Sequence, residues 1–369
     1  MNIGFALEYS LGHATHADNL KHFVGDGSRS GVRPFFVDVP FENTPVGMLA
    51  RLPGVRSNWS LRASCGAYLG MRKSARRLDA ALFHTQVTSL LSAGLMRRLP
   101  SVISLDATPL QYDRIGTHYG HTASGNASIE ALKKRVNERA FRAAKHLVTW
   151  SEWAKASLVS DYGVSEQKVT VIPPGIDLKR WHFPKKMGGG KRELNLLFVG
   201  GDFERKGGDT LLCALTEHLP AGVSAHLHVV TRSAVNLPSG APVTIHRGLG
   251  PNCDALRRLY ADADAFVFPT RADCLPLAVL EAMASGLPVI TTDVGALSEA
   301  VGHGEAGIIV PPDDPRSLAR AIATLASSPE LRDRYSTRAR QIAEERFDGT
   351  RNYARLLTVL TETAERKSR

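Results

Sequence analysis

Short apolar segments alternate with longer amphipathic segments along the whole chain. In the first half, the apolar runs are NIGFALEY, VRPFFVDV, DAALFHT, PSVISLD and HLVTWS. The segments between them place their apolar residues at helical spacing. This alternation is typical of a parallel sheet covered by helices.

The alternation stops near the middle of the chain and then restarts. The segment KVTVIPPGIDLKRWHFPKKMGGGKRE has one short strand, then prolines, then a glycine and lysine cluster that extends neither helix nor strand. After this linker the apolar runs are LNLLFVGG, AHLHVVT, VTIHRG, AFVFPT, LPVITTD and AGIIVPP, and three helical segments close the chain. A chain of 369 residues also exceeds what one core usually supports. We therefore predict an α/β protein with domains at 1–183 and 184–347, and a C-terminal helix at 348–369 that packs back on the first domain.

Composition narrows the class of protein. No apolar run approaches the roughly 20 residues that span a bilayer, and MNIGFALEYSLGH has neither a basic region nor a cleavage site. We therefore expect a cytoplasmic protein. The four cysteines lack C-x-x-C spacing, so we expect free thiols rather than disulfides or a zinc site.

The formal charge of +10 is compatible with an anionic partner. Much of it lies in MRKSARRLDA and IEALKKRVNERAFRAAKHL, and we favour solvated helix faces over a dedicated binding patch. A peripheral contact of these helices with the inner face of a membrane remains open. Aromatic residues make up 7% of the chain and fall mostly in strands, which argues against a nucleic-acid binder.

The stretch TRADCLPLAVLEAMASGLPVIT begins with a turn that follows the strand AFVFPT. Ligands of open parallel sheets bind at the carboxyl ends of strands. Pro276 suits the first position of the following helix, and Leu275 offers no side-chain oxygen as a cap. The amides of Leu277 and Ala278 are therefore open to an anion.

Two carboxylates flank this helix start. Glu281 lies among apolar residues, where an ionised carboxylate needs hydrogen-bond donors such as vicinal sugar hydroxyls. Asp273, eight residues earlier, would reach a second polyol on the far side of the anion. The order sugar, phosphate, ribose predicts a nucleotide-sugar site. In the structural alternative, which is the commoner one for an isolated pair, Glu281 pairs with an Arg and Asp273 shapes a turn.

A glycine-rich turn changes that balance. LLFVGGDFERKGGDTLL is a strand, a turn holding Arg205 and Lys206, and a helix, so it brings backbone amides and two cations to a phosphate. Alone, Gly200 and Gly201 are as well explained as turn glycines, and the segment matches neither the Walker pattern nor the dinucleotide fingerprint. Two phosphate-compatible sites in one domain favour a diphosphate ligand.

With these residues the sequence resembles the retaining, nucleotide-sugar-dependent glycosyltransferases of family four. LEAMASGLPVIT, with Asp273 before it, is similar to the family's Glu-x7-Glu motif, and FVGGDFERKGG is similar to its phosphate loop. VIPPGID and VGALSEAVGHGEAGIIVPPDD are also similar to family segments, and the likeness runs from about Val169 to the end. The resemblance implies two facing Rossmann-like domains, the GT-B fold, with the active-site cleft between them.

The same resemblance implies roles for the residues. Glu281 would hold the ribose, Asp273 the hydroxyls of the transferred sugar, and Arg205 with Lys206 the diphosphate. Asp273 stands where the family usually has Glu, and Gly201 stands where it often has Arg. The reaction implied is a metal-independent hexosyl transfer with retention by front-face attack; the nucleotide-diphosphate sugar is a co-substrate, and no cofactor is expected.

The first domain offers fewer signals. Gly12 resembles the family's glycine turn beneath the donor phosphate. His84 and Asp106 end predicted strands, and we count Asp106 among the candidate catalytic residues by its location. His84 fits a core histidine as well as an acceptor-side residue. Tyr112 lies in DATPLQYDRIGTHYGH, which we interpret as an irregular acceptor loop.

No metal site is expected. Asp262 and Asp264 form a D-x-D pattern, but they precede a strand at the end away from the expected ligand, which favours a solvated turn. The pairs His13 and His16, His118 and His121, and His226 and His228 come with no further ligand cluster.

Two rival functions remain open. A nucleotide-sugar epimerase of the same fold would need acid and base carboxylates but no acceptor loop. A non-catalytic binder of nucleotide sugars or nucleic acid would use the positive charge alone. The acceptor, whether a glycan, a lipid-linked sugar or a small molecule, is not identified by the sequence.

Overall fold

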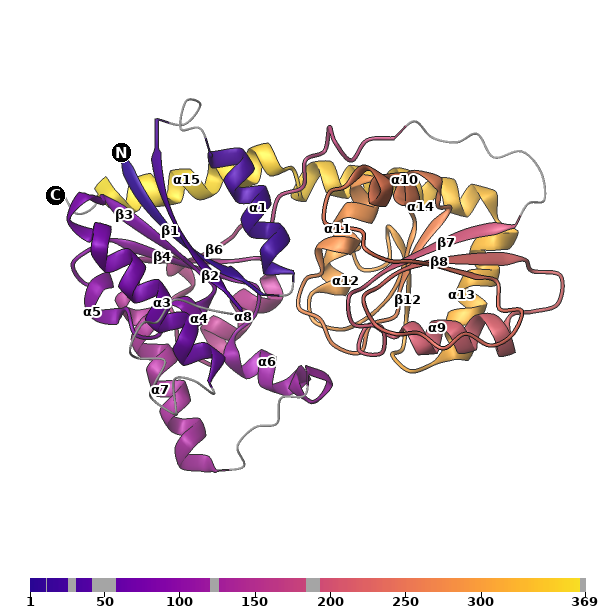
Figure 1. Ribbon diagram of the computed structural model, residues 1–369, viewed down its shortest axis with the longest axis horizontal. Coiled ribbons are helices and arrows are strands. Elements are labelled where there is room, and N and C mark those ends of the chain that lie inside the picture. The colour runs from indigo at the N-terminus through magenta and orange to yellow at the C-terminus, as the bar shows by residue number, and fades with distance from the viewer. Residues whose placement is uncertain (11, 26–30, 42–57, 120–125, 184–192, 366–369) are drawn as a thin grey trace. The chain divides into compact units, whose positions relative to one another are not determined.

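The chain folds into two α/β units, each built on a six-stranded parallel sheet (Figure 1). The computed structural model describes residues 1–10, 12–25, 31–41, 58–119, 126–183 and 193–365. Unit 1 comprises Met1–Arg114, His121–Gly175 and Gly349–Arg369, and unit 2 comprises Ile115–Gly120 and Ile176–Asp348. The predicted α/β class with two parallel sheets is confirmed.

The sheet of unit 1 has the strand order β2-β1-β3-β4-β5-β6, and every neighbouring pair is parallel. Its strands are β1 (Asn2–Tyr9), β2 (Arg33–Pro40), β3 (Ala80–His84), β4 (Ser101–Leu105), β5 (His146–Thr149) and β6 (Val169–Val171). The order reverses between β1 and β3, because the chain moves to one side of β1 for β2 and to the other side for the later strands.

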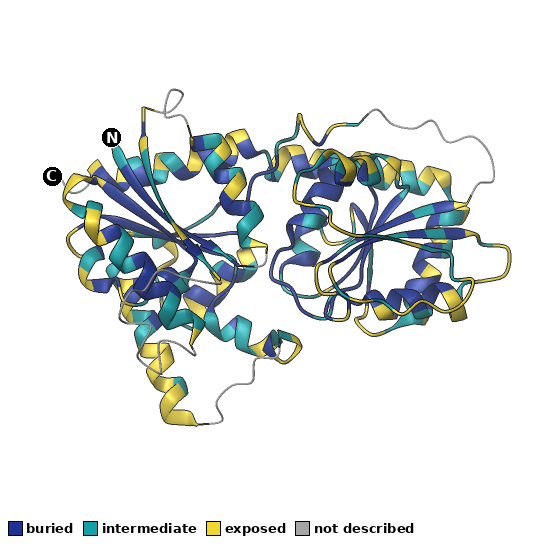
Figure 2. Cartoon of the chain, in the orientation of Figure 1, coloured by how far each residue is buried: buried dark blue, intermediate teal, exposed yellow. Residues whose placement is uncertain are grey.

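Helices cover both faces of this sheet, and Figure 2 shows the strands as its buried layer. The helical segments of this half are α1 (His13–Val24), α3 (Trp59–Ser74), η2 (Ala75–Arg77), α4 (Gln86–Ser89), α5 (Ala93–Met96), α6 (Pro109–Ile115), α7 (Ala127–Ala143), α8 (Glu152–Ser160) and η4 (Glu166–Lys168). The short helix η3 (Gly116–Tyr119), which follows α6, belongs to unit 2. Helices α1 and α15 (Gly349–Glu365) share one core with Ile3, Phe5 and Leu7 of β1. Helices α3, α5, α7 and α8 share the core on the other face.

The sheet of unit 2 has the order β12-β11-β10-β7-β8-β9 and is also parallel throughout. Its strands are β7 (Leu194–Val199), β8 (Ala225–Val230), β9 (Val243–His246), β10 (Ala265–Phe268), β11 (Val289–Thr292) and β12 (Gly307–Val310). Its helices are α9 (Gly208–Cys213), which continues as a π turn (Ala214–His218), α10 (Asp254–Asp262), α11 (Leu277–Ala284), α12 (Leu297–Ala300), α13 (Pro315–Ser327) and α14 (Pro329–Arg346). Figure 1 shows α9 and α13 on one side of β7 and β8, and α10, α11 and α14 on the other.

Local capping explains several helix starts. Asn58, Asn126 and Ser151 each accept a hydrogen bond from a backbone amide in the first turn of the helix that follows. Asp314 and Ser328 do the same for α13 and α14, and both of those helices carry a proline in their first turn.

Two of the points at which the chain passes between the units, 175–176 and 348–349, lie side by side. The Ile176 amide donates to the Phe347 carbonyl at 2.8 Å, and Ile176 pairs with Asp348 in a parallel bridge. On the unit 1 side, Gly175 packs so closely against Gly349 that a side chain at Gly175 would overlap it. The main segment of unit 2, Ile176–Asp348, is therefore inserted between Gly175 and Gly349 of unit 1.

One local prediction about the fold differs from the structure. The segment predicted as an irregular acceptor loop is helical over α6 and η3, where Gln111 is buried and its amide group donates to the Trp153 carbonyl at 2.8 Å. The remainder of that segment, 120–125, lies outside the described residues. Within the described residues, no helix has the length and apolar character needed to cross a bilayer.

Candidate functional site

The two motifs of unit 2 meet at the point where the strand order reverses. β7 lies beside β10; the chain runs from β7 through β8 to β9 in one direction, and from β10 through β11 to β12 in the other. The loops 200–207 and 269–276 leave these neighbouring parallel strands at their carboxyl ends. Such a switch point is where open parallel sheets bind ligands.

Two glycines allow the loops to pack backbone against backbone. Gly207 has φ of 75°, and a Cβ there would overlap the Pro269 carbonyl. Gly295, in the turn after β11, has φ of 60°, and a Cβ there would overlap the Asp273 carbonyl. Glycine is required at both positions, because each has a positive φ and lies against a backbone carbonyl. These two contacts hold the Asp273 loop in place against the neighbouring loops.

Arg205 and Lys206 from the first loop reach Asp273 in the second. The Lys206 ammonium forms an ion pair with the Asp273 carboxylate, and Arg205 Nη1 lies 3.9 Å from the same oxygen. Arg205 also donates to Asp202 at 3.0 Å and to the Ala272 carbonyl at 2.7 Å. The structure thus brings three predicted site residues together, with both cations engaged by carboxylates.

Burial acts on the charge of Lys206. Loss of hydration lowers the pKa of the Lys206 ammonium, while the Asp273 carboxylate opposes that shift. The positive charge of the neighbouring Arg205 lowers it further. Asp273 therefore does more than shape a turn, because it compensates a buried cation.

Glu281 projects from α11 into a buried environment. Its side chain is 5% exposed, and the Tyr260 hydroxyl donates to it at 3.1 Å. Burial raises the pKa of the Glu281 carboxyl to about 7. No arginine or lysine of the described chain pairs with Glu281, so the alternative of an Arg ion pair at this position is wrong.

The start of α11 is shifted by one residue from the prediction. Pro276 is the N-cap with φ of −73° and ψ of 125°, and the helix begins at Leu277. The Val279 amide donates to the Pro276 carbonyl at 3.1 Å. Within the described residues, the amides of Leu277 and Ala278 have no acceptor, as the sequence predicts.

A third cation that the sequence did not indicate lies beside the glycine-rich turn. Arg232, which follows β8, is exposed, and a Cβ added at Gly201 would lie 3.0 Å from its guanidinium. A Cβ added at Gly200 would lie 3.0 Å from the Lys206 side chain. Arg232 therefore brings a guanidinium from the end of the adjacent strand to the side of Gly201.

In unit 1 the strand order reverses between β1 and β3, and a histidine cluster lies there. His13 Nδ1 is 3.2 Å from His84 Nε2, and His13 Nε2 is 3.6 Å from a carboxylate oxygen of Asp106. The Trp150 ring stacks on His84 with centroids 5.3 Å apart. The structure brings Asp106 and His84 together through His13, which we had considered only as a metal ligand.

The members of this cluster differ in how far they are buried. His84 and His16 are buried, and loss of hydration lowers the pKa of His84 well below its ordinary value and that of His16 to about 3. The side chains of His13 and Asp106 are 16% and 17% exposed. His13 and Asp106, rather than His84, are therefore the members of the cluster that are partly exposed.

Gly12 and Tyr112 occupy simpler positions. Gly12 is the N-cap of α1 with φ of −67°, and a Cβ there would meet no atom within 4 Å. Neither its backbone angles nor its packing against the described residues requires glycine at this position. Tyr112 lies on α6 and is half-buried.

Glu8, at the end of β1, was missed by sequence reasoning. Its carboxylate is buried and accepts hydrogen bonds from the hydroxyls of Ser10 and Thr85. These contacts tie the turn after β1 to the turn after β3. A carboxylate near the end of an apolar strand, followed closely by a serine, was the only local signal.

The residues considered as metal ligands have structural partners. Asp264 accepts from the Asn195 amide at 2.9 Å at the start of β10, away from the switch point. His226 lies 2.8 Å from the Thr244 hydroxyl, and His228 lies 3.1 Å from His246. His121 lies outside the described residues.

Comparison with known families gives two matches. The model described as "Glycosyltransferase Family 4" matches residues 29–180, and the model described as "Glycosyl transferases group 1" matches residues 193–328. Together they cover more than three quarters of the chain.

Curated relatives include D-inositol 3-phosphate glycosyltransferase of Segniliparus rotundus, which is 29% identical over 59% of this chain and 55% of its own length. The MMP alpha-(1->4)-mannosyltransferase of Mycolicibacterium hassiacum is 29% identical over 58% of this chain and 53% of its own length. The chain thus spans just over half the length of these relatives.

Solved structures with the same fold include sucrose-phosphate synthase from Thermosynechococcus elongatus, with a TM-score of 0.74, 18% identity and 98% coverage of both chains. Anabaena HepE in complex with UDP-glucose has a TM-score of 0.70 and 16% identity over 98% of this chain and 100% of its own. At these identities the likeness shows the fold alone, which is that of the GT-B glycosyltransferases.

Proposed function

The chain belongs to the family-four glycosyltransferases, and on that premise we propose that it transfers a sugar from a nucleotide-diphosphate sugar to an acceptor hydroxyl. One observation carries the proposal. Arg205, Lys206 and Asp273 meet at the switch point of unit 2, beside the helix that holds Glu281.

Glu281 would bind the ribose of the donor. Its carboxylate has one donor, Tyr260, and retains lone pairs for the two hydroxyls of a vicinal diol. A carboxylate that titrates near neutrality ionises readily when such donors arrive, because hydrogen bonds to the charged form lower its pKa.

The ion pair of Lys206 and Asp273 would open when the donor binds. A diphosphate would replace the Asp273 carboxylate as the partner of Lys206, since both anions accept charge-assisted hydrogen bonds from an ammonium group. The released Asp273 would then accept hydrogen bonds from hydroxyls of the transferred sugar. Its side chain is shorter than the usual Glu of the family, and the Gly295 contact fixes its backbone.

Charge stabilisation of the leaving group would come from protein groups rather than from a metal. Lys206, Arg205 and the free amides of Leu277 and Ala278 all surround the proposed diphosphate position. Transfer would therefore continue in the presence of a chelator. Retention would follow from front-face attack, with a leaving-group oxygen taking the acceptor proton.

Unit 1 would supply the acceptor-side groups. Asp106 and His13 are partly exposed at the switch point of that unit, with Tyr112 on the helix that follows. A carboxylate and an imidazole within 4 Å suit hydrogen bonding to a polyol. The names of the two curated relatives indicate different acceptors, and for this chain we propose a compound with a free hydroxyl as the acceptor.

The experiment is a thermal-shift panel of nucleotide sugars, with and without EDTA, combined with an assay of nucleoside diphosphate release. We expect one donor to raise the melting temperature through mass action, in EDTA as well as without it. Glu281→Ala should abolish the shift, and Glu330→Ala, an exposed carboxylate at the start of α14, should keep it. An equal shift in Glu281→Ala would refute the site.

The rival functions give distinct outcomes in the same assay. An epimerase would convert the donor's sugar without releasing nucleoside diphosphate. A non-catalytic binder would show the shift with no product, whichever acceptor is supplied.

A membrane contact would involve α7. Its first turns expose Ile129 and Leu132, which are 45% and 61% exposed, beside Lys133, Lys134 and Arg135. Figure 2 shows this end of α7 as exposed. Apolar and basic side chains on one exposed helix suit the surface of an anionic bilayer.

Vesicle sedimentation tests this contact. We expect the protein to pellet with phosphatidylglycerol vesicles and not with phosphatidylcholine vesicles, and Leu132→Ser with Lys134→Gln to reduce the bound fraction severalfold. Binding that is unchanged in this variant would exclude α7 as the contact.

A further inference from the structure

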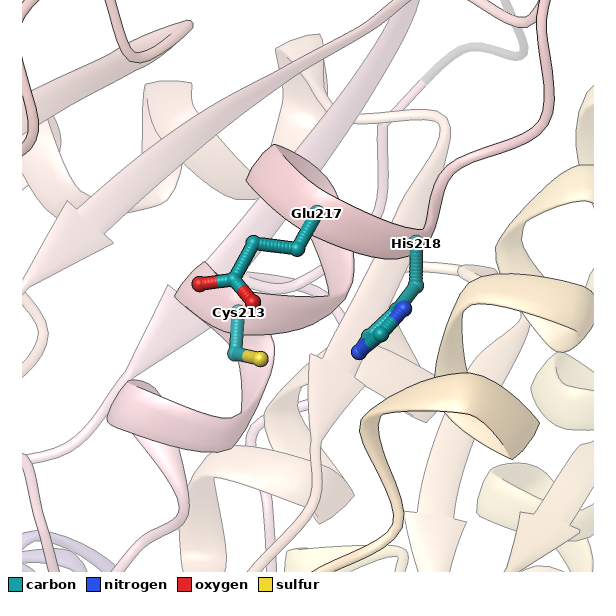
Figure 3. A group of neighbouring side chains, drawn as sticks. All are labelled: Cys213, Glu217 and His218. Carbon is teal, nitrogen blue, oxygen red and sulfur yellow. The ribbon is translucent and has the colours of Figure 1, made fainter.

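Three potential metal ligands lie together at the carboxyl end of α9. Cys213 is the last residue of that helix, and Glu217 and His218 belong to the π turn that continues it. Their ligand atoms all lie within 4.8 Å of one another. Figure 3 shows the Glu217 side chain folding back toward Cys213, with the His218 ring on the same side.

The π turn explains why these three residues share one side of the helix. Residues four apart, such as Cys213 and Glu217, are neighbours on any helix surface. Residues five apart are turned by about 140° in a regular α-helix. The i to i+5 hydrogen bonds of a π turn bring the fifth residue back over the first, so His218 joins the pair.

The π turn is anchored by the buried residues on the face opposite the three ligand side chains. Ala214 and Leu215 are buried, and the turn packs against α13. The ligand side chains therefore project from a supported backbone, while Glu217 itself is exposed and leaves a path for an ion.

The Glu217 carboxylate has the Cys213 thiol as a hydrogen-bond partner, but it has no cationic partner among the described residues. An acidic residue in the last turn of a helix faces the negative end of the helix dipole and destabilises it. In the described ranges, Glu217 makes no ion pair within 4.0 Å, and no side-chain hydrogen bond of His218 is found. A cation bound here would satisfy both groups.

We propose that Cys213, Glu217 and His218 bind one zinc ion, with a fourth position open to water. A thiolate, an imidazole and a carboxylate are the ligand types that zinc takes, at about 2.3, 2.0 and 2.1 Å. Those lengths place ligand atoms about 3.3 to 3.6 Å apart around a tetrahedral ion. The three ligand atoms lie within 4.8 Å of one another, so they need approach by at most about 1.5 Å to reach these values.

Binding would release one proton. The Cys213 thiol loses its proton as the zinc–sulfur bond forms, while His218 binds as neutral imidazole and Glu217 as carboxylate. The site lies at the opposite end of α9 from Gly207 and the Lys206 loop, so zinc binding is separate from the proposed metal-independent transfer.

The test uses the full chain, stripped with EDTA and titrated with Co²⁺, which replaces zinc and gives a charge-transfer absorption only when a thiolate is bound. We expect this absorption to saturate at one Co²⁺ per chain and to be displaced by Zn²⁺. Cys213→Ser should abolish it, and His218→Ala and Glu217→Gln should each weaken binding about 100-fold.

Cys253→Ser is the matched control. Cys253 is half-buried, like Cys213, and caps α10 by accepting from the Leu256 amide at 3.4 Å, a role that serine can fill. The Co²⁺ spectrum should be unchanged in this variant. A folded wild-type chain without the thiolate absorption, or the same absorption in Cys213→Ser, would overturn the proposal.

Discussion

At the scale of single residues, the protonation of Glu281 sets how the proposed donor site responds to pH. Its pKa in the free protein is about 7, raised by burial from an ordinary value of 4.5. The folded state therefore loses stability as the pH rises from about 4.5 through 7, because ionisation is then favoured in the unfolded chain. A ligand that donates hydrogen bonds to the carboxylate binds the ionised form.

We predict that affinity for the donor falls up to tenfold for each pH unit below 7 and is constant above about 8. Calorimetric titration with a nucleotide sugar at several pH values measures this dependence. A nucleotide sugar is the suitable ligand because its diphosphate is a diester, which has no ionisation near pH 6 such as a phosphate monoester has. Glu281→Gln should bind more weakly and with no dependence on pH in this range. A parallel pH dependence in both proteins would assign the titration to another group.

Asp273 and Lys206 give a second prediction at this scale. Asp273→Asn removes the carboxylate that occupies Lys206, so we expect nucleoside diphosphate to bind severalfold more tightly. The same change removes a contact to the transferred sugar, and kcat should fall about 100-fold. Equilibrium binding and turnover, measured on one preparation, should move in opposite directions. If Asp273→Asn weakened nucleoside diphosphate binding and also lowered kcat, the role of Asp273 would be to stabilise the loop rather than to contact the sugar.

The sequence revealed site residues that belong to local motifs and missed those whose partners are distant in the chain. Asp273, Glu281, Arg205 and Lys206 stand out because each is a charge in an apolar or glycine-rich context. In the sequence, Tyr260 is one of the apolar positions of the amphipathic helix α10. No neighbouring residue in the sequence indicates that its hydroxyl donates to a carboxylate on α11. Partners of this kind depend on which strands are adjacent, which no local pattern encodes.

At the scale of elements, the loop after β7 and the turn after β1 differ in what they require of glycine. Gly207→Ala places a Cβ on the Pro269 carbonyl at a positive φ, and we predict a loss of at least about 2 kcal/mol of stability. Gly12→Ala meets neither obstacle and should leave the melting temperature unchanged.

Thermal melting and donor binding of the two variants separate the roles. If Gly12 lies beneath the donor phosphate, Gly12→Ala should weaken donor binding at an unchanged melting temperature. Normal donor binding in Gly12→Ala would show that the turn after β1 does not approach the ligand.

All twelve strands of the described structure could be predicted, because each is a short apolar run bounded by turn residues. The helical α6 was mistaken for a loop, since its polar side chains are satisfied by distant groups such as the Trp153 carbonyl. The π turn after α9 could not be predicted either, because its residues have the same spacing and composition as an ordinary helix end.

At the scale of the whole molecule, α15 completes the core of unit 1. Leu360 is fully buried among residues of α1, β1 and β3. We predict that Leu360→Ala destabilises unit 1 by about 2 to 5 kcal/mol. Hydrogen exchange should rise in peptides from β1 and β3 and stay unchanged in peptides from β7 and β10.

Thr358→Ala, an exposed change on the same helix, should leave both sets of peptides unchanged. Equal acceleration in the two sheets would instead show that the units unfold as one cooperative body.

The insertion of the main segment of unit 2 between Gly175 and Gly349 has a consequence for synthesis on the ribosome. The first 175 residues emerge early, yet the core that α1 and α15 share on one face of their sheet is incomplete until α15 follows. The second sheet is continuous in the chain and is complete by then, so the later half matures first. Because the Ile176 and Asp348 ends of that segment meet, the segment could be exchanged as a unit by gene rearrangement, and under the proposed function such an exchange would alter the donor site and leave unit 1 intact.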